Sequence, residues 1–551
     1  MNIGALMVTK MNKTLTNHIH GHPKNSCGSG GGRGRSRPWR QSRMGTALVA
    51  VAALLLSTTA WLSLVFSGTT TRCWHRFKDW EGSPHSFPWA WRNQSFVVSS
   101  PPPPPPPPLP LPLPFPTHNR SLSEKEEELS LKHIVFGIAG SSQLWNRRKE
   151  FVRLWWRPDE MRGHVWLEEP LPLGLALENG DDSLPPLIVS EDISRFRYTN
   201  PTGHPSGLRI SRIISECFRL GLPNVRWYIL GDDDTIFNVD NLVALLHKYD
   251  HSQMVYIGSP SESHSSNTHF SHSMAFGGGG IAISHPLAQA LSLILDDCLD
   301  RYPKLYGSDD RLHACISELG VPLTREPGFH QWDIRGNAHG LLSSHPVAPF
   351  VSIHHVEAVD PFYPGLSSLD SLKLFTKAMT LNPTTFLQRS ICYDRPRRLT
   401  FSVSLGYVVQ VFPNIVLPRD LERSELTYSA WNKISQRNEF DFDTRDPYTS
   451  LCKKPTLFFL KHVWKQPNAT LSSYARATGT DNFKTRLLCF PRSPPLRHLK
   501  YIHVLGHPLT NNWHLAPRRL CCKLNQTTEE GLRLTVGQCG KAAFGSTTGF
   551  L

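Results

Sequence analysis

Three consecutive carboxylates, Asp232, Asp233 and Asp234, follow a hydrophobic run from Val225 to Leu230. Like charges at the end of one strand repel one another unless a cation neutralises them. Carboxylate oxygens are hard ligands that suit Mg²⁺ or Mn²⁺, and such an ion often binds phosphate oxygens as well. The triplet therefore indicates a site for a metal ion and a diphosphate, with a solvated acidic turn as the alternative.

Four consecutive glycines form a second candidate site, before the apolar run from Ile281 to Ser284. They are Gly277, Gly278, Gly279 and Gly280. Glycine allows a positive φ and a close approach of the backbone to a ligand. Because the flanks are hydrophobic, the run favours a backbone cradle for a bound sugar over a flexible loop.

A third pair of acids, Asp309 and Asp310, opens a helical stretch that begins near Gly307. Acids in the first turn of a helix often cap its free amide groups. Capping by one of the two carboxylates leaves the other available as a general base.

Alternating strands and helices must position these groups. We predict strands over 133–140, 186–189, 225–230 and 255–258, and helices over 147–156, 208–220 and 285–298. This alternation is typical of an α/β domain with a parallel sheet, which binds its ligands beyond the carboxyl ends of the strands. The aspartate triplet falls at such an end.

The N-terminal part predicts membrane anchoring. Residues 44–66 carry no charge and are long enough for a transmembrane helix, which takes about 20 residues. The tail over residues 1–43 contains eight lysines and arginines and no acid, so it is expected to stay in the cytosol. A cleaved signal peptide is the alternative, but the apolar run is longer than the usual h-region. Since the tail supplies eight of the net +14 charges and no nucleic-acid motif occurs, we predict no nucleic-acid partner.

Residues 67–132 predict a stem on the lumenal side, because the proline run from Pro101 to Pro108 favours extended polyproline II. Ten cysteines beyond the anchor are compatible with several disulfides in the secretory lumen. Four glycosylation sequons begin at Asn93, Asn119, Asn468 and Asn525 and give the same topology weak support.

The ordered motifs DDDT, GGGGIAIS, GSDDRLHACISELGVPLT and PFVSIHHVE resemble the Fringe-like branch of glycosyltransferase family 31, and within it the plant Fringe-related proteins of uncharacterised activity. The resemblance covers about residues 133–365. It implies a GT-A fold over 133–380, a UDP-sugar donor, a glycan or glycoprotein acceptor and Mn²⁺, with Mg²⁺ as the alternative. It further implies a single-pass type II protein of the Golgi membrane with its catalytic domain in the lumen.

The resemblance also implies roles for individual residues. Asp232 would contact the nucleotide ribose, with Asp233 beside it at the donor, and Asp234 would bind the metal ion. His354 or His355 would be the second protein ligand, and the order His-Val-Glu favours His355. Asp310 would be the catalytic base, with Asp309 as the alternative. The expected reaction is transfer with inversion, by default in a β1,3 linkage.

Other features remain open. Trp332 could stack on an acceptor sugar or pack in the core. Residues 381–551 predict a cysteine-containing, β-rich region of unknown role, with a strand over 400–412. A phosphatase is a distant alternative, because Ile236 stands where that pattern requires threonine. A catalytically inactive lumenal carbohydrate-binding or scaffold protein is a nearer one.

Overall fold

The structure, a computed structural model, describes residues 127–172, 182–344, 349–431, 439–450, 452–477, 498–510, 520–527 and 531–539. Among these residues, none of the helices combines the length and the apolar character that a membrane span needs. The tail, the predicted anchor and most of the stem lie outside the described residues, so the membrane topology stays a prediction.

A seven-stranded sheet forms the centre of the α/β part, in the order β3-β2-β1-β4-β7-β6-β8. The strands are β1 (Ile134–Ala139), β2 (Arg162–Leu167), β3 (Leu187–Val189), β4 (Trp227–Asp232), β6 (Tyr256–Gly258), β7 (Ile281–Ser284) and β8 (Leu323–Arg325). β1 runs parallel to β2 and β4, whereas β7 is antiparallel to both β4 and β6. The sheet is therefore mixed, and the expectation of a parallel sheet is corrected at β7.

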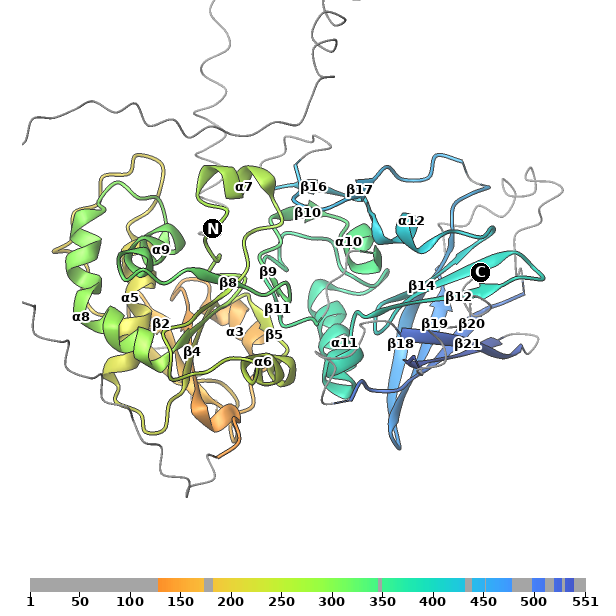
Figure 1. The fold of residues 1–551 in the computed structure, drawn as a ribbon, viewed down its shortest axis with the longest axis horizontal. Helices are drawn as coiled ribbons and strands as arrows, with labels where there is room; N and C mark the ends of the chain where they lie inside the picture. Colours follow the sequence, from red (N-terminus) through yellow and green to blue (C-terminus); the bar gives the residue numbers. More distant parts are fainter. Residues whose placement is uncertain are drawn as a thin grey trace, which may run out of the picture. The chain divides into compact units, whose positions relative to one another are not determined.

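Helices cover both faces of this sheet (Figure 1). One face packs on α5 (Ser206–Arg219), α8 (His285–Arg301) and α9 (Ser308–Glu318) through a common apolar cluster. The other face packs on α3 (Trp145–Arg153) and α6 (Val239–Leu246). Every strand residue of β1 and β7 is buried, which explains why their sequences read as continuous apolar runs rather than alternating ones.

In the part of the chain that the structure describes, three short sheets complete the α/β part and the C-terminal region, and the pairing of β10 with β16 joins the two. β5 (Ile236–Phe237), β11 (Ser352–Ile353) and β9 (Phe329–His330) form one sheet, and β10 (Ile334–Gly336) pairs with β16 (Tyr428–Ala430) in another. β15 (Ser424–Glu425) pairs with β17 (Thr444–Arg445). The remaining helices are α7 (His264–His269), α10 (His339–Ser344), α11 (Ser368–Leu381) and α12 (Pro418–Glu422), with 3₁₀ turns at Leu131–His133 and Pro383–Thr385.

The C-terminal region is a closed barrel of strands in the order β12-β13-β14-β18-β19-β20-β22-β21. Their bounds are β12 (Arg389–Asp394), β13 (Leu399–Ser404), β14 (Val408–Phe412), β18 (Thr456–Gln466), β19 (Ala469–Arg476), β20 (Tyr501–Gly506), β21 (Leu520–Thr527) and β22 (Gly531–Gln538). The region is β-rich, as predicted. The single strand expected over 400–412 is instead the hairpin of β13 and β14, because Gly406 turns the chain with a φ of +83°.

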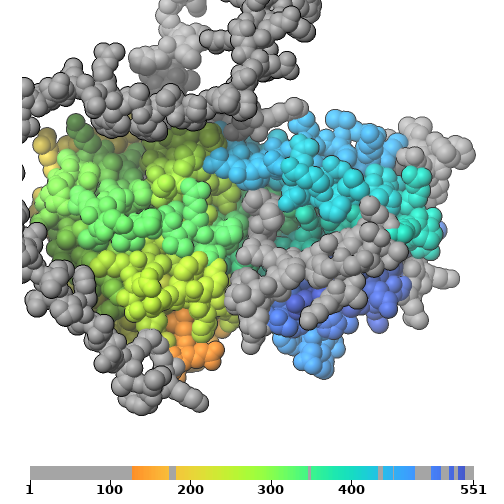
Figure 2. All heavy atoms as spheres, viewed as in Figure 1, coloured from red at the N-terminus to blue at the C-terminus, as the bar shows by residue number. Residues whose placement is uncertain are grey.

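The segment that begins at Glu439 lies against α7 and the residues beside it. The Glu439 carbonyl accepts a hydrogen bond from the His264 amide (2.7 Å), and the Asp441 carboxylate accepts one from the Asn267 side chain (2.7 Å). Figure 2 shows the blue surface of this segment beside the yellow-green surface of α7. The C-terminal region thus contacts the α/β part well away from the barrel strands.

Three disulfides lie within the described residues, Cys298–Cys315, Cys392–Cys522 and Cys521–Cys539, so the prediction of several bridges is confirmed. Cys217 is buried and not in a disulfide. The Cys298–Cys315 bridge ties α8 to α9, the helix whose first turn carries Asp309 and Asp310.

We expect the double substitution Cys298→Ser/Cys315→Ser to loosen α9. A disulfide that closes a loop of this size contributes about 3 kcal/mol, so amide exchange in residues 308–318 should accelerate by up to ~100-fold. Cys521→Ser/Cys539→Ser is a matched control, because its sequence separation of 18 is close to the 17 of the first pair. Hydrogen exchange is measured by mass spectrometry, and the control should leave α9 as protected as in the wild type. Unchanged protection of α9 in Cys298→Ser/Cys315→Ser would contradict the expectation.

Candidate functional site

Three ligand-type side chains converge at the end of β4. The Nε2 atom of His354 lies 3.3 Å from Oδ2 of Asp232 and 3.1 Å from Oδ1 of Asp234. One ligand atom from each of these residues lies within 4.8 Å of the others. Asp234 and His354 are buried, and Asp232 is about one third exposed. Two carboxylates and one imidazole around one point could hold a divalent cation.

The local fold explains this convergence. Asp232 is the last residue of β4, and the chain turns at Asp233 and Asp234 before it enters β5. β5 pairs with β11 in antiparallel register, with Ile236 opposite Ile353. His354 follows directly after β11, so the pairing brings it to the aspartate triplet.

The pKa shifts of Asp234 and His354 indicate the charges that surround this point. Burial alone would raise the pKa of Asp234, but the charges of His354 and Arg148 outweigh it and hold that pKa well below its usual range. Burial lowers the pKa of His354, yet Asp234 and Asp232 together raise it to about 10. The Asp234 carboxylate is therefore ionised near neutral pH, and a protonated His354 supplies the positive charge beside it. A metal ion would have to displace that proton, because a ligating imidazole is neutral.

Asp233 is used differently from its two neighbours. Its side chain is buried, and it accepts hydrogen bonds from Nη1 of Arg148 (2.5 Å) and from the backbone amide of Ser141 (3.2 Å). Arg148 also lies 2.9 Å from Asp234 and 2.9 Å from Glu357. Asp233 was predicted to contact the sugar donor. Its carboxylate is buried, however, and both of its oxygens accept hydrogen bonds from protein groups.

The glycine run lies against the functional side chains. A Cβ atom added at Gly278 would fall 2.2 Å from the ring of His354, and one added at Gly277 would fall 2.6 Å from Oδ1 of Asp309. Gly280 has a φ of +100°. Of the four glycines, Gly277 lines the pocket beside Asp232, whereas Gly278 and Gly279 face His354 and the backbone of Gln331. The glycines thus allow two side chains to approach the backbone, a role that the sequence did not indicate.

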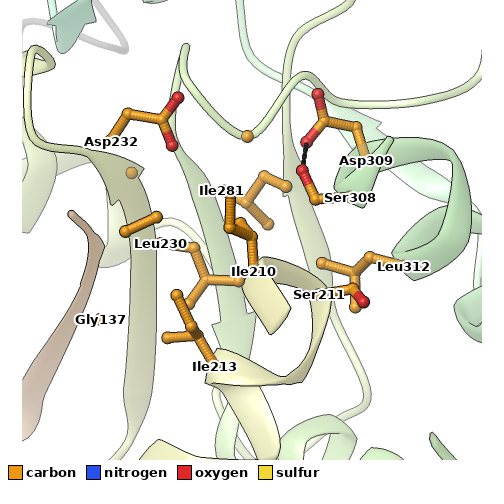
Figure 3. Close-up of a pocket in the computed structure, with 13 residues that line it drawn as sticks. Gly137, Ile210, Ser211, Ile213, Leu230, Asp232, Ile281, Ser308, Asp309 and Leu312 are labelled. Atoms are coloured by element: carbon orange, nitrogen blue, oxygen red, sulfur yellow. Dashed lines mark hydrogen bonds between the residues drawn. The ribbon is translucent and has the colours of Figure 1, made fainter. Parts of the chain in front are cut away.

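Asp232 and Asp309 lie on opposite sides of one pocket, as Figure 3 shows. Asp309 comes from the first turn of α9, and Ser308 donates a hydrogen bond to its carboxylate (3.1 Å). Burial raises the pKa of Asp309 to about 7, and the charge of Asp232 adds to this shift. A carboxylate with such a pKa can accept a proton near neutral pH.

Asp310 does not line this pocket. It accepts hydrogen bonds from the backbone amides of Tyr306 (2.7 Å) and Gly307 (2.9 Å), and so caps α9. The geometry therefore favours capping for Asp310 and leaves Asp309 at the pocket, the reverse of the preferred prediction.

His355 and Trp332 also differ from their preferred roles. Nδ1 of His355 lies 3.2 Å from the Asp333 carboxylate, and its ring stacks between those of His354 and Trp431. It is therefore not one of the three converging residues, and His354 takes that place. Trp332 is fully buried and packs on Phe362 at 5.8 Å between centroids, so it has no surface on which an acceptor sugar could stack.

Sequence reasoning missed Arg148, Asp333 and Trp431. Arg148 stands next to Arg147 in α3, and nothing in the sequence distinguishes the buried arginine from the exposed one. Glu357, which follows the histidine pair by two residues, contacts both arginines. Trp431 lies in the C-terminal region, and only the pairing of β10 with β16 brings it to the site.

Parts of this chain are similar to known proteins. The family described as "Protein of unknown function, DUF604" matches residues 266–522, which include the glycine run, α9, the histidine pair and most of the barrel. The mouse β-1,3-glucosyltransferase is 34% identical over 107 residues, which are 19% of this chain and 21% of that protein. The human β-1,3-glucosyltransferase is 32% identical over 105 residues, or 19% of this chain and 20% of that protein.

This chain therefore spans about a fifth of the curated relatives that it matches. Mouse xyloside xylosyltransferase 1 covers 35% of this chain at 11% identity, but its TM-score of 0.24 does not show a shared fold. The sequence matches support a likeness to glycosyltransferases of family 31. The narrower resemblance to Fringe and to its plant relatives gains no support from them.

The raised pKa of Asp309 predicts a pH-dependent stability. A carboxyl group whose pKa is higher in the folded than in the unfolded chain stabilises the fold at low pH, and this stabilisation is lost as the pH rises through about 7. Asp309→Asn removes the titration. In EDTA, we expect the melting temperature of Asp309→Asn to exceed that of the wild type at pH 8 and the difference to shrink toward pH 4.

The control is Asp250→Asn, which removes an exposed carboxyl group whose pKa is lowered to about 2 by hydrogen bonds from Ser252, so the pH trend of its stability relative to the wild type should have the opposite sign. Thermal melts followed by circular dichroism suffice for both variants. A difference between Asp309→Asn and the wild type that stays constant between pH 4 and pH 8 would contradict the raised pKa.

Proposed function

We propose that the chain is an inverting glycosyltransferase that uses a divalent cation to transfer a hexose from a UDP-sugar to a hydroxyl group of a glycan or glycoprotein. The observation that carries the proposal is the convergence of Asp232, Asp234 and His354 next to a pocket that Asp309 also lines. The partial identity to β-1,3-glucosyltransferases supports the reaction class and makes a β1,3 linkage the first one to test.

Each group has a role in a direct displacement. The acceptor oxygen forms a bond to the anomeric carbon, the bond from that carbon to the diphosphate breaks, and UDP leaves. Asp309 takes the acceptor proton, for which its pKa of about 7 is suited. Asp234, Asp232 and His354 would hold Mn²⁺ or Mg²⁺, which neutralises the charge of the departing diphosphate.

This proposal assigns His354, rather than His355, to the metal ion and Asp309, rather than Asp310, to the acceptor proton. Asp232, with its partly exposed carboxylate, also remains free to contact the ribose. Gly277 is the glycine that a donor sugar would contact, because it lines the pocket.

The proposed location is the Golgi lumen, with the chain anchored as a single-pass type II membrane protein. The motives are the basic tail, the uncharged span over 44–66 and the sequons beyond it. The disulfides are compatible with an oxidising compartment. No observation favours the catalytically inactive alternative.

Donor hydrolysis tests the proposal most simply. The purified chain is incubated with UDP-glucose, UDP-galactose and UDP-N-acetylglucosamine in the presence of Mn²⁺, and released UDP is measured. We expect release from one donor, its loss in EDTA, and no metal-dependent UDP binding in Asp234→Ala, because that substitution removes a buried anionic ligand. A wild-type chain that binds UDP equally well with and without the metal ion would contradict the metal site.

Matched asparagine substitutions separate the two acids of α9. Asp309→Asn should retain UDP binding and lower transfer by about 10²- to 10⁴-fold, the usual contribution of general-base catalysis. Asp310→Asn should stay close to the wild-type rate, since asparagine is also a good capping residue. A stable, fully active Asp309→Asn together with an inactive Asp310→Asn would return the role of base to Asp310.

A further inference from the structure

We propose that Trp431 is a positioning residue for the candidate metal site, because its indole ring fixes His355, and His355 in turn fixes the ligand ring of His354. The inference rests on the proposed function. It assigns to the C-terminal region a part in a site whose ligands all belong to the α/β part of the chain.

Four flat groups form a continuous stack. The rings of His354 and His355 lie 3.8 Å apart between centroids at an interplanar angle of 29°. His355 and Trp431 lie 4.1 Å apart at 10°. The guanidinium of Arg335 lies 4.0 Å from the centroid of Trp431. Since the two imidazoles and the indole are stacked and the Arg335 guanidinium lies over the indole face, each group limits the tilt of the ring beside it.

Backbone contacts hold the Trp431 end of this stack. The Trp431 amide donates a hydrogen bond to the Asp333 carbonyl (3.0 Å), and Nε of Arg335 donates one to the Trp431 carbonyl (3.0 Å). The first contact continues the antiparallel pairing of β10 with β16, in which Ile334 lies opposite Ala430, and the second adds a side-chain bond from β10. Trp431 therefore follows directly after β16 and is tied to β10 by two hydrogen bonds.

The Asp333 carboxylate lies at the edge of the His355 ring, and Trp431 covers its face. Oδ1 of Asp333 lies 3.2 Å from Nδ1 of His355, and Oδ2 accepts a hydrogen bond from Ser261 (2.6 Å). His355 has a φ of +56°, in the left-handed region that residues other than glycine adopt uncommonly, although histidine does so more often than most. Contacts at the edge and on the face of the ring help to hold this conformation.

His354 depends on packing for its orientation. A histidine that binds a metal ion usually donates the proton of its other ring nitrogen to a carboxylate or a carbonyl, which fixes the ring. Among the described residues, Nδ1 of His354 has no such hydrogen-bond partner. The ring instead contacts the backbone of Gly278 and the ring of His355. Loss of the stack would therefore leave Nε2 free to turn away from Asp232 and Asp234.

The experiment compares Mn²⁺ affinity in variants of the full chain. Trp431→Leu removes the flat ring, and Trp431→Phe keeps one. Free Mn²⁺ is measured by electron paramagnetic resonance during titration in the presence of UDP, and the melting temperature is recorded for every variant. We expect Mn²⁺ to bind about 10-fold more weakly to Trp431→Leu, the lower end of the effect of residues that orient metal ligands, and Trp431→Phe to recover most of the affinity.

Two controls separate positioning from general stability. Trp464→Leu removes an exposed tryptophan of the barrel and should leave both readouts unchanged. Cys521→Ser/Cys539→Ser should lower the melting temperature without changing the Mn²⁺ affinity of the folded chain. If Trp431→Leu does not fold, Trp431→Met, which is flexible and better able to fill the volume, takes its place.

The outcomes distinguish the two proposals. A wild-type chain that binds no Mn²⁺ overturns the proposed function. A wild-type chain that binds Mn²⁺, together with a Trp431→Leu variant whose affinity is within about twofold of it, overturns the positioning role alone. The same holds if Trp431→Phe is as impaired as Trp431→Leu, because the flat ring would then be irrelevant.

Discussion

The structure depends on the neutralisation of three adjacent carboxylates at the end of β4. Arg148 binds Asp233 and Asp234 from one side, and His354 lies between Asp232 and Asp234 on the other. Arg148 and His354 are themselves buried, so each would be costly without its acidic partners. His354 reaches the triplet because β5 pairs with β11 and because Gly278 leaves room for its ring, so both features serve this neutralisation.

Periodicity in the sequence was sufficient to predict much of the α/β part. The predicted strands at 133–140, 225–230 and 255–258 correspond to β1, β4 and β6, and the helix predicted over 208–220 corresponds to α5. The antiparallel direction of β7 was not predictable, since the short run from Ile281 to Ser284 carries no information on pairing partners. The barrel was predicted only as β-rich, because its closure joins β12 to β21 across more than a hundred residues.

The sequence predicted which groups of residues form the site, but not which member of each pair takes part. Residue types and order were enough to select the triplet, the histidine pair and the acids of α9. They could not separate Asp309 from Asp310, since a shift of one residue in the helix start exchanges the cap and the pocket residue. They could not separate His354 from His355 either, because Asp333 and Trp431 decide between the two and neither is near in sequence.

The most direct test of the account is the number and identity of the imidazole ligands of bound Mn²⁺. Electron spin echo envelope modulation of Mn²⁺ with UDP detects nitrogen from a coordinated histidine. We expect one coordinated imidazole in the wild type, its loss in His354→Gln and its retention in His355→Gln. Retention of the nitrogen signal in His354→Gln, or loss of it in His355→Gln alone, would contradict the assignment of Asp232, Asp234 and His354 as the metal site.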